Sequence, residues 1–520
     1  MQRLKKIRVG ISLFFFAIVT FLFLDLWEIF PTSVTTFFVS LQLIPSLTKI
    51  LTYTALSSLG LGFVLLLTLL FGRVYCSSIC PLGTLQDVVI KIAKRNRKRR
   101  WFKYRKPYTL LHYSLFGIIT LAFASGSLIL LNLVEPFSNY GRIISNLFNP
   151  LVGHVNNAAA FILGKFGLYT LHALFIRPVQ IWALIVPVLF LAVVVYMSYN
   201  HGRLFCNTLC PAGAFLGILS RVSFFKIVVN EETCTECKLC EKVCKANCIE
   251  SGKKMIDFSQ CVSCFNCIDV CPSVGLKYEN YWKETLLHRK SKPVDESRRQ
   301  FMGAAVSSAA MATIPITVAN DSTAASPISY GESRRTPVTP PGSRSTAHFT
   351  NYCTACHLCV TACPPQVLYP SFIEYGIAGV FQPRMNYNAS YCNYDCTVCG
   401  EVCPSGAILP LGKEAKKLVQ IGKAAFVKDD CIVITKKKDC GACSEHCPTK
   451  AVHMIPYEGK LMLPELNNDI CVGCGACEHA CPTVPRKAIY VTSNTTHQVA
   501  KKPQVKKVEG DFDNTKDFPF

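Results

Sequence analysis

The spacing of the cysteines constrains this chain more than any other feature. Of its 29 cysteines, four follow one another as C-x2-C-x2-C-x3-C from Cys234 to Cys244, and this pattern or a close variant recurs five more times. Three closely spaced thiolates with a remote fourth are the ligands of cubane iron–sulfur clusters. A zinc site would instead place two ligands, a long gap and two more. The spacing therefore predicts [4Fe–4S] clusters.

Two of the motifs lie close together within residues 231–280. In two-cluster ferredoxins the fourth cysteine of each motif crosses to the neighbouring cluster. One predicted cluster is therefore held by Cys234, Cys237, Cys240 and Cys271, and the second by Cys244, Cys261, Cys264 and Cys267. Cys248 is left over, and we interpret it as a small buried thiol rather than a ligand.

Four more motifs lie within residues 353–490, and each of them ends in Cys-Pro. Their cysteines are Cys353, Cys356, Cys359 and Cys363; Cys392, Cys396, Cys399 and Cys403; Cys431, Cys440, Cys443 and Cys447; and Cys471, Cys474, Cys477 and Cys481. Sequential pairing of the motifs and nested pairing fit their intervals equally well. The six motifs predict six clusters and leave almost no thiol for a disulfide framework.

Apolar stretches indicate a membrane domain before the first motif. Hydrophobic residues make up 50% of the chain, and its mean hydropathy of +0.29 is high for a soluble protein. Four stretches are long enough to cross a bilayer, at about 8–29, 51–71, 108–132 and 180–199. A fifth, at 158–176, is interrupted by glycine and lysine, and we interpret it as an interfacial helix at the outer surface.

Basic residues set the predicted orientation. The run from Lys91 to Lys106 holds ten Lys and Arg residues, whereas the connections 30–50 and 133–179 hold few. By the positive-inside rule, the N-terminus, the 72–107 loop and the segment after residue 200 are cytoplasmic. The same run accounts for much of the net charge of +22, and no nucleic-acid motif accompanies it, so nucleic acid is not an expected partner.

The second and fourth apolar stretches end in one repeated pattern. Gly72–Gly83 and Gly202–Gly213 both read G-R-apolar-aromatic-C-x3-C-P-x-G, which indicates a duplicated two-helix unit. We expect the four cysteines of this repeat to come together as one redox site, with a further iron–sulfur centre as the favoured content: Cys76, Cys80, Cys206 and Cys210. The alternative is a structural or dithiol role, in which proline only turns the chain.

A second crossing signal follows the first cysteine-rich region. Arg298 and Arg299 lie in Ser-Arg-Arg-Gln-Phe-Met before an apolar run to about Ala319, a pattern typical of twin-arginine export. This route carries folded cargo, as cluster-loaded domains must be. The alternative is an arginine pair that flanks an ordinary helix. We expect 301–319 to remain as a fifth span that delivers 320–520 to the outer side.

The predicted fold class is a membrane α-helical bundle of four spans plus a fifth, joined to two α+β domains of bacterial ferredoxin type. The predicted order is a transmembrane domain at 1–222, a cytoplasmic two-cluster domain at 223–290, the signal and fifth helix at 291–319, a linker at 320–350, a periplasmic four-cluster domain at 351–492 and a disordered tail at 493–520.

These features resemble two known protein families. The four spans, the C-x3-C-P motifs and the first cluster domain look like the NapH-type membrane quinol dehydrogenases. The twin-arginine signal, Pro340-Pro341-Gly342 and the four later motifs look like the NapG/MauM-type periplasmic ferredoxins, as if both were fused head to tail. The resemblance implies a bacterial inner-membrane protein that oxidises quinol from the membrane pool and passes electrons to a periplasmic reductase, usually through a c-type cytochrome. The chain has no C-x-x-C-H site, so haem would belong to the partner.

Titratable residues near the ends of the apolar stretches are the predicted quinol ligands. His112 and His201 lie at the cytoplasmic ends, and Glu135 and Arg142 at the outer ends. For each of them an interfacial anchor or a helix cap is the alternative role. Two other functions stay open: a factor that supplies electrons to mature or reactivate a periplasmic metalloenzyme, and an exporter of electrons from a cytoplasmic ferredoxin.

Overall fold

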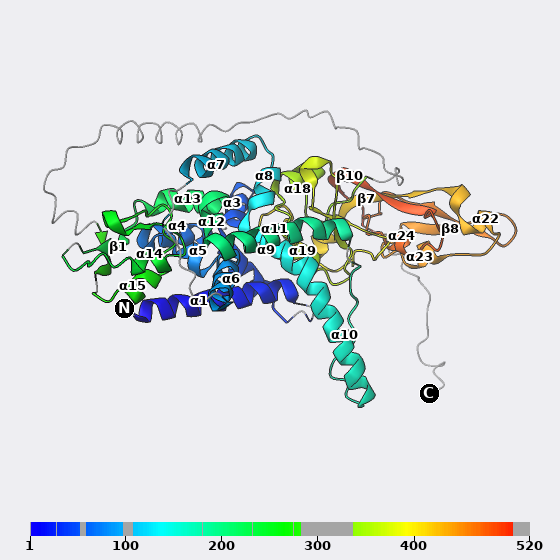
Figure 1. Ribbon diagram of the computed structural model, residues 1–520. Coiled ribbons are helices and arrows are strands. Elements are labelled where there is room, and N and C mark those ends of the chain that lie inside the picture. The colour runs from blue at the N-terminus through cyan, green and yellow to red at the C-terminus, as the bar shows by residue number, and fades with distance from the viewer. Residues whose placement is uncertain are drawn as a thin grey trace, which may run out of the picture.

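A computed structural model describes residues 2–25, 27, 29–52, 59–96, 104, 108–178, 180–230, 232–273, 275–281 and 336–502. The chain forms a central helical domain with one cysteine-rich domain at each end (Figure 1). We call the domain of residues 223–281 the inner domain and that of residues 336–502 the outer domain, after the sides of the membrane that the sequence predicts for them. The predicted export signal at Arg298 and Arg299 and the fifth span at 301–319 lie outside the described residues.

Two helices in the described part of the chain are long and apolar enough to cross a membrane: α1 (Gln2–Leu24) and α11 (Ile181–His201). They correspond to the first and fourth predicted spans. The second and third predicted spans contain shorter apolar helices, α4 (Leu59–Phe71) and α7 (Thr109–Ala124). Among the described residues the helix lengths do not confirm four spans, and residues 53–58 of the second predicted span lie outside that part of the chain.

A bent pair of helices occupies a stretch that the sequence placed in an outer connection. Helices α2 (Thr32–Ser40) and α3 (Leu43–Thr52) are apolar enough to form one span together, but they meet at 102°. Pro45 lies in the first turn of α3, where a helix tolerates proline. The remaining helices of this domain are short: α5 (Val74–Ser78), α6 (Pro81–Asn96), α8 (Ile129–Val134), α9 (Pro136–Ile143), the π-helix η2 (Ile144–Phe148), α12 (Leu204–Thr208) and α13 (Pro211–Ser220).

Helix α10 (Asn149–Lys165) leaves the bundle at a steep angle to α1 and projects away from it (Figure 1). The interfacial helix was expected at 158–176, so the observed helix begins earlier and ends earlier. It ends where Gly164 and Gly167 interrupt the apolar run, and Gly167 adopts a φ of +74° that other residues rarely take. The described residues between α10 and α11 form no helix or strand.

The inner domain is built from short elements around its cysteines. Strand β1 (Phe225–Val229) pairs antiparallel with β4 (Leu276–Asn280), and β2 (Ile249–Glu250) pairs with β3 (Met255–Ile256). Two helical turns, α14 (Leu239–Val243) and α15 (Asn266–Val270), and the 3-10 turn η3 (Ser251–Lys253) complete it. Its apolar core is continuous with that of the helical domain, so the two parts bury their surfaces together.

The outer domain uses three further antiparallel pairs. Strand β5 (Leu368–Pro370) pairs with β6 (Pro383–Met385), β8 (Val452–Pro456) with β9 (Met462–Leu466), and β7 (Val419–Phe426) with the long β10 (Ile489–Val499). Its helical turns are α18 (Thr346–Tyr352), α19 (Leu358–Thr361), η4 (Ile377–Gly379), α20 (Val398–Glu401), α21 (Lys413–Lys416), η5 (Lys428–Asp430), α22 (Ile432–Thr435), α23 (Ala442–Glu445) and α24 (Ala476–Ala480).

Helix α1 reaches from one cysteine-rich domain to the other. Near its start, the Lys5 ammonium lies 2.6 Å from the Asp269 carboxylate of the inner domain. Near its end, Phe23 is buried in a core that includes Phe349 and Val360 of the outer domain. An α-helix rises about 1.5 Å per residue, so the two domains are held about one bilayer core apart.

Two predicted boundaries of the outer domain are wrong. The linker predicted to run to residue 350 ends earlier, because Thr339 and Ser343 are fully buried in the domain. The tail predicted to be disordered from residue 493 continues β10, in which Gln498 pairs with Gln420 and Val499 with Val419. The segment is polar, but its threonines favour an extended strand and the partner strand satisfies its backbone.

Truncation should separate the two parts of this tail. Removal of residues 493–520 should lower the free energy of unfolding of the outer domain by about 2–4 kcal/mol, because strand pairs and the 2.8 Å hydrogen bond between Thr339 and His497 are lost. Removal of residues 503–520 alone is the matched control and should have little effect. The denaturant midpoint for loss of cluster absorbance measures both, and equal midpoints for the two truncations would contradict the prediction.

Candidate iron–sulfur centres

The four cysteines of the repeated motif meet inside the helical domain. Cys76 lies on α5 and Cys206 on α12, and Cys80 and Cys210 precede α6 and α13. All four are buried in one core, and the Cys80 and Cys210 thiols each interact electrostatically with cysteines of both repeats. The structure therefore brings the two cysteine pairs of the repeat together, as the sequence predicts.

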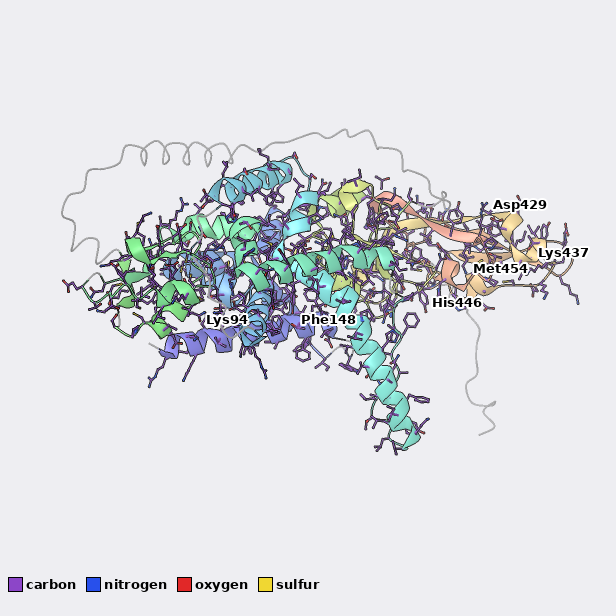
Figure 2. All side chains as sticks on the ribbon, in the orientation of Figure 1. Lys94, Phe148, Asp429, Lys437, His446 and Met454 are labelled. Carbon is purple, nitrogen blue, oxygen red and sulfur yellow. The ribbon has the colours of Figure 1, made fainter. Side chains whose placement is uncertain are left out.

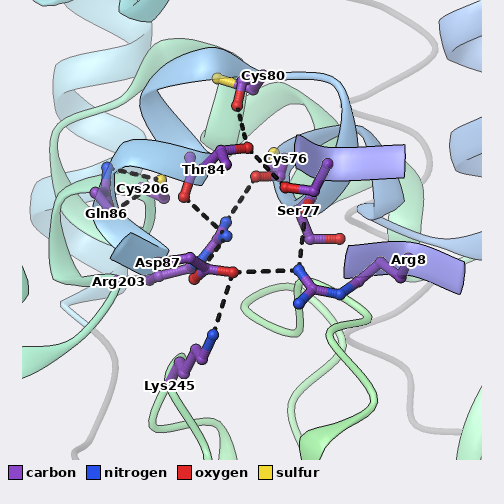
Figure 3. Close-up of polar contacts among 12 residues, drawn as sticks. Arg8, Cys76, Ser77, Cys80, Thr84, Gln86, Asp87, Arg203, Cys206 and Lys245 are labelled. Atoms are coloured by element: carbon purple, nitrogen blue, oxygen red, sulfur yellow. Dashed lines mark hydrogen bonds and ion pairs between the residues drawn. The ribbon is translucent and has the colours of Figure 1, made fainter. Parts of the chain in front are cut away.

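Two buried arginines cross between the repeats, and Figure 3 shows one of them, Arg203. Arg203 donates to the carbonyl oxygens of Cys76 at 2.6 Å and of Gly83 at 3.0 Å. Arg73 donates to the carbonyl oxygen of Cys206 at 3.0 Å and to the Asn207 side chain at 2.9 Å. Each repeat thus supplies the cation that fixes the other repeat's cysteine loop, an arrangement with approximate twofold symmetry.

The charges around these cysteines are mostly positive. Asp87 pairs with Arg8 at 3.1 Å, with Arg203 at 2.9 Å and with Lys245 at 3.1 Å (Figure 3). Arg73 is fully buried and has no carboxylate partner among the residues that the structure describes. Buried cations need a compensating negative charge, and four thiolates around an iron–sulfur cluster supply one. The donor set therefore fits such a centre.

The inner domain groups its cysteines across the two motifs. One cavity is lined by Cys234, Cys237, Cys240 and Cys271, and a second is lined by Cys244, Cys248, Cys261, Cys264 and Cys267. In each cavity the fourth motif cysteine comes from the other motif. Cys248 is buried, with its Sγ 3.5 Å from that of Cys244, and this hydrogen bond lowers the pKa of the Cys244 thiol to about 7.

In the motifs with two-residue gaps, the backbone adopts left-handed conformations around the second cysteine. In each motif with two-residue gaps, the residues on both sides of the second cysteine have positive φ: Glu236 and Lys238, Ser263 and Phe265, Ala355 and His357, and Gly473 and Gly475. For the six that are not glycine this conformation costs about 1 kcal/mol or more each. Such strain persists where the surroundings dictate it, and wrapping three thiols around one cluster would do so.

The outer domain settles which motifs pair. Cys403 interacts electrostatically with Cys353 and Cys356, and Cys363 with Cys392. The third and fourth motifs exchange their fourth cysteines in the same way. One cavity there is lined by Cys431, Cys440, Cys443 and Cys481. Pairing is thus sequential rather than nested. Cys356, for which burial raises the pKa to about 12, would have to lose its proton to ligate iron.

The four outer groups form a series. The group of Cys353, Cys356, Cys359 and Cys403 contacts the helical domain through the Cys353 carbonyl. The group of Cys363, Cys392, Cys396 and Cys399 follows. The Cys392 amide then donates to the Cys474 carbonyl at 2.9 Å, which joins the two motif pairs. The group that includes Cys431 lies last, in the part of the domain where Figure 2 shows Asp429 and Lys437 farthest from the helices.

The first outer motif is seated on the helical domain by direct contacts. Asn132 donates to the Cys353 carbonyl at 3.2 Å, and Asn146 donates to His357 Nδ1 at 3.1 Å. A Cβ added at Gly141 would lie 2.4 Å from the Cys356 carbonyl oxygen, so only glycine permits this approach. Burial lowers the pKa of His357 to about 3, which keeps the imidazole neutral as this hydrogen bond requires.

The four residues predicted as quinol ligands do not meet at one site. His112 donates to the Cys210 carbonyl at 3.2 Å, and Asn247 donates to the His201 carbonyl at 3.1 Å. Glu135 caps α9 by accepting from the Phe137 and Ser138 amides, and Arg142 donates to the Asn132 and Ser138 carbonyls. The side chains of His112, Glu135 and Arg142 thus bond to backbone groups, as anchors and helix caps do. At His201 the printed contact involves the backbone carbonyl and not the imidazole.

The arginines of the repeated pattern are Arg73 and Arg203, for which the sequence alone indicates no role. The sequence did not indicate Asp87 or Gln86 as residues of the site. The Gln86 side-chain amide lies 3.4 Å from Cys206 Sγ. An arginine repeated at the end of an apolar helix was the available signal. In the described part of the chain, no three His, Cys, Asp or Glu side chains stand at metal-ligand spacing, so the groups are defined by shared cavities and electrostatic contacts.

Comparison with protein families identifies cluster-binding regions. The 4Fe-4S binding domain family matches residues 53–100 and 182–229, which contain the two repeats, and the 4Fe-4S dicluster domain family matches residues 352–407 and 436–484. The last two matches follow the sequential pairing of the outer motifs. The predictions of 4Fe-4S domains and of membrane helices are thus confirmed at this level.

Several known proteins are similar to parts of the chain. The ferredoxin-type protein NapH of Haemophilus influenzae is 27% identical over 234 residues, which are 43% of this chain and 68% of NapH. The ferredoxin-type protein NapF of Escherichia coli is 29% identical over 136 residues, 26% of this chain and 74% of NapF. An uncharacterized protein of Methanocaldococcus jannaschii is 26% identical over 231 residues, 42% of this chain and 70% of its own length. No solved structure matches. The chain is an iron–sulfur electron-transfer protein with membrane helices.

The crossed loops should not tolerate a side chain at either repeat glycine. A Cβ at Gly83 would lie 2.1 Å from the Cys76 carbonyl oxygen, and one at Gly213 would lie 2.1 Å from that of Cys206. Gly83→Ala and Gly213→Ala should each displace a cysteine loop and remove about four iron atoms per chain with one EPR signal. Gly62→Ala, with nothing within 4 Å, is the control. Full iron content in both variants would contradict a centre at these cysteines.

Proposed function

We propose that the chain oxidises quinol at the bacterial inner membrane and passes the electrons through six [4Fe–4S] clusters, and a further centre at the membrane cysteines, to a periplasmic reductase or c-type cytochrome. The serial order of the cysteine groups, from the helical domain to the far end of the outer domain, carries this proposal. Iron–sulfur clusters supply one-electron carriers; the protein fixes their order and their surroundings.

Polar contacts continue this order into the helical domain. Tyr75 interacts electrostatically with Cys80, Cys76 and Glu135, and its hydroxyl accepts from the Leu43 amide at 3.2 Å. Glu135 in turn interacts with Cys356 of the first outer group. These contacts support a connection between the membrane cysteines and the outer domain. The similarity to NapH, a protein of ferredoxin type, and the resemblance to a NapH and NapG fusion point the same way.

A second function, export of electrons from a cytoplasmic ferredoxin, is favoured by one observation. The two crossing arginines face the inner domain as well as the membrane cysteines. Arg203 interacts electrostatically with Cys206 and with Cys264, and Arg73 donates to the Ser259 carbonyl at 2.8 Å beside Cys261. These contacts support a series in which the inner cysteine groups precede the membrane cysteines. Quinol oxidation at the outer side alone would not require the inner groups.

Selective reduction separates the two functions. In the full-length protein with oxidised clusters, a menaquinol analogue should reduce the outer clusters, because the outer groups lie nearest the outer membrane surface. In the Cys76→Ser, Cys206→Ser double variant, a reduced soluble ferredoxin should no longer reduce the outer clusters through the inner domain. Thr208→Ser is the control on the same helix as Cys206. EPR under anaerobic mixing measures both reactions. Failure of the quinol analogue to reduce the wild type would reject quinol oxidation.

The proposed topology makes the arginine pair at 298–299 essential for export. Arg298→Lys with Arg299→Lys should leave residues 350–502 inside the cell, since twin-arginine signals depend on both guanidinium groups. A second pair, Arg334 and Arg335, offers the matched control with the same substitutions. Protease added to spheroplasts should cleave the outer domain in wild type and control only. Equal protection in all three proteins would contradict the export route.

A further inference from the structure

A cavity lies at the junction of the helical domain and the outer domain. One wall is formed by η2, the start of α10, residues 174–178 (the strap) and Gln180, and the other by the end of α19 and residues 366, 369 and 370. The strap is tied across the cavity by two hydrogen bonds: Arg177 donates to the Val360 carbonyl at 2.6 Å, and Gln366 donates to the Phe175 carbonyl at 2.9 Å. The cavity is therefore built from segments far apart in the sequence.

Several polar atoms around this cavity are unpartnered. Ser145 is 6% exposed and Tyr369 is 2% exposed. Among the described residues, neither their hydroxyls nor Arg177 Nε nor Gln180 Oε1 has a hydrogen-bond partner. A buried polar group left unbonded costs about 1–3 kcal/mol, so proteins rarely leave several together. Four such atoms around one cavity indicate a ligand that offers both donors and acceptors.

The apolar residues around the cavity favour a ligand that has an apolar ring and polar substituents. Pro150, Phe175 and Ile176 contribute apolar lining beside the polar atoms. Ala183, in the first turn of α11, also lines the cavity and places it at the outer end of a candidate span. Apolar side chains that are more than half exposed flank it on α10 and α11, at Leu151, Val155, Ile181 and Ile185. A ligand could thus keep an apolar tail in the lipid while its polar head enters the cavity.

We propose that this cavity binds the headgroup of a quinol that enters from the outer leaflet, with the Ser145 and Tyr369 hydroxyls, Gln180 and Arg177 facing its oxygens. The inference rests on the quinol oxidation proposed above and assigns its site. The bound ring would lie beside the loops of Cys359 and Cys363, because Arg177 bonds to Val360 and interacts electrostatically with both thiols. None of the four predicted quinol ligands lines this cavity.

Binding of a fluorescent quinol analogue, heptyl-hydroxyquinoline N-oxide, tests the site in the full-length protein. Tyr369→Phe and Ser145→Ala each remove only an unpartnered hydroxyl, so the fold should be kept. Each should weaken binding of the probe about 3- to 10-fold, the value of one hydrogen bond. Tyr352→Phe, in the same domain as Tyr369, is the matched control, and Thr350→Ser is a second control, since neither Tyr352 nor Thr350 lines the cavity. Both controls should bind the probe as the wild type does.

Three outcomes decide the proposal. An unchanged Kd in both cavity variants, or displacement of the probe by a phospholipid but not by a menaquinol analogue, would overturn the site. If the variants weaken binding while quinol fails to reduce the wild-type clusters, the cavity assignment stands and the proposed function fails. If quinol reduces wild type and both variants at equal rates below saturation, the function stands and the site lies elsewhere.

Discussion

The crossed arginines are the interaction on which the rest of the structure depends. A guanidinium placed in an apolar bundle is costly unless its donors are satisfied. Arg203 and Arg73 each donate to carbonyl oxygens of the opposite repeat, so each cysteine loop is held in its observed form by the other repeat. The same residues also seat the inner domain, because the Arg203 amide donates to the Lys245 carbonyl at 2.8 Å and Arg73 reaches Ser259.

The outer domain is joined to the other end of the bundle by the same kind of contact, in which side chains bond to backbone carbonyls. Backbone carbonyls of the first outer motif are bonded by side chains of the helical domain, and Gly141 allows the close approach. Sequential pairing then gives two compact units, each of which exchanges its fourth cysteines internally. Because only Cys392 and Cys474 join the two units by a direct backbone bond between motif cysteines, the groups extend in one direction. The order of the cysteine groups is thus a consequence of local cysteine spacing and one junction.

Local spacing explains what the sequence could predict. The C-x2-C pattern predicted the inner groups, including the exchange of Cys244 and Cys271, because the distances involved are set by a few residues of backbone. Sequential pairing was not readable, since equal intervals carry no information about which motifs pack together. The bent pair α2 and α3 was missed because the sequence placed residues 30–50 in a connection, and β10 was missed because its polar side chains gave no alternating pattern.

The cavity shows why binding sites are harder to predict than ligand motifs. Titratable residues at the ends of apolar runs looked like quinol ligands, yet Glu135 and His112 bond to backbone groups. A charge near a membrane is costly, so it is commonly held by structural partners. The unpartnered atoms at the junction belong instead to Ser145, Tyr369 and Gln180, whose residue types are common in ordinary cores and loops. Their significance arises only from packing of two domains, and packing between distant segments is what a single sequence does not display.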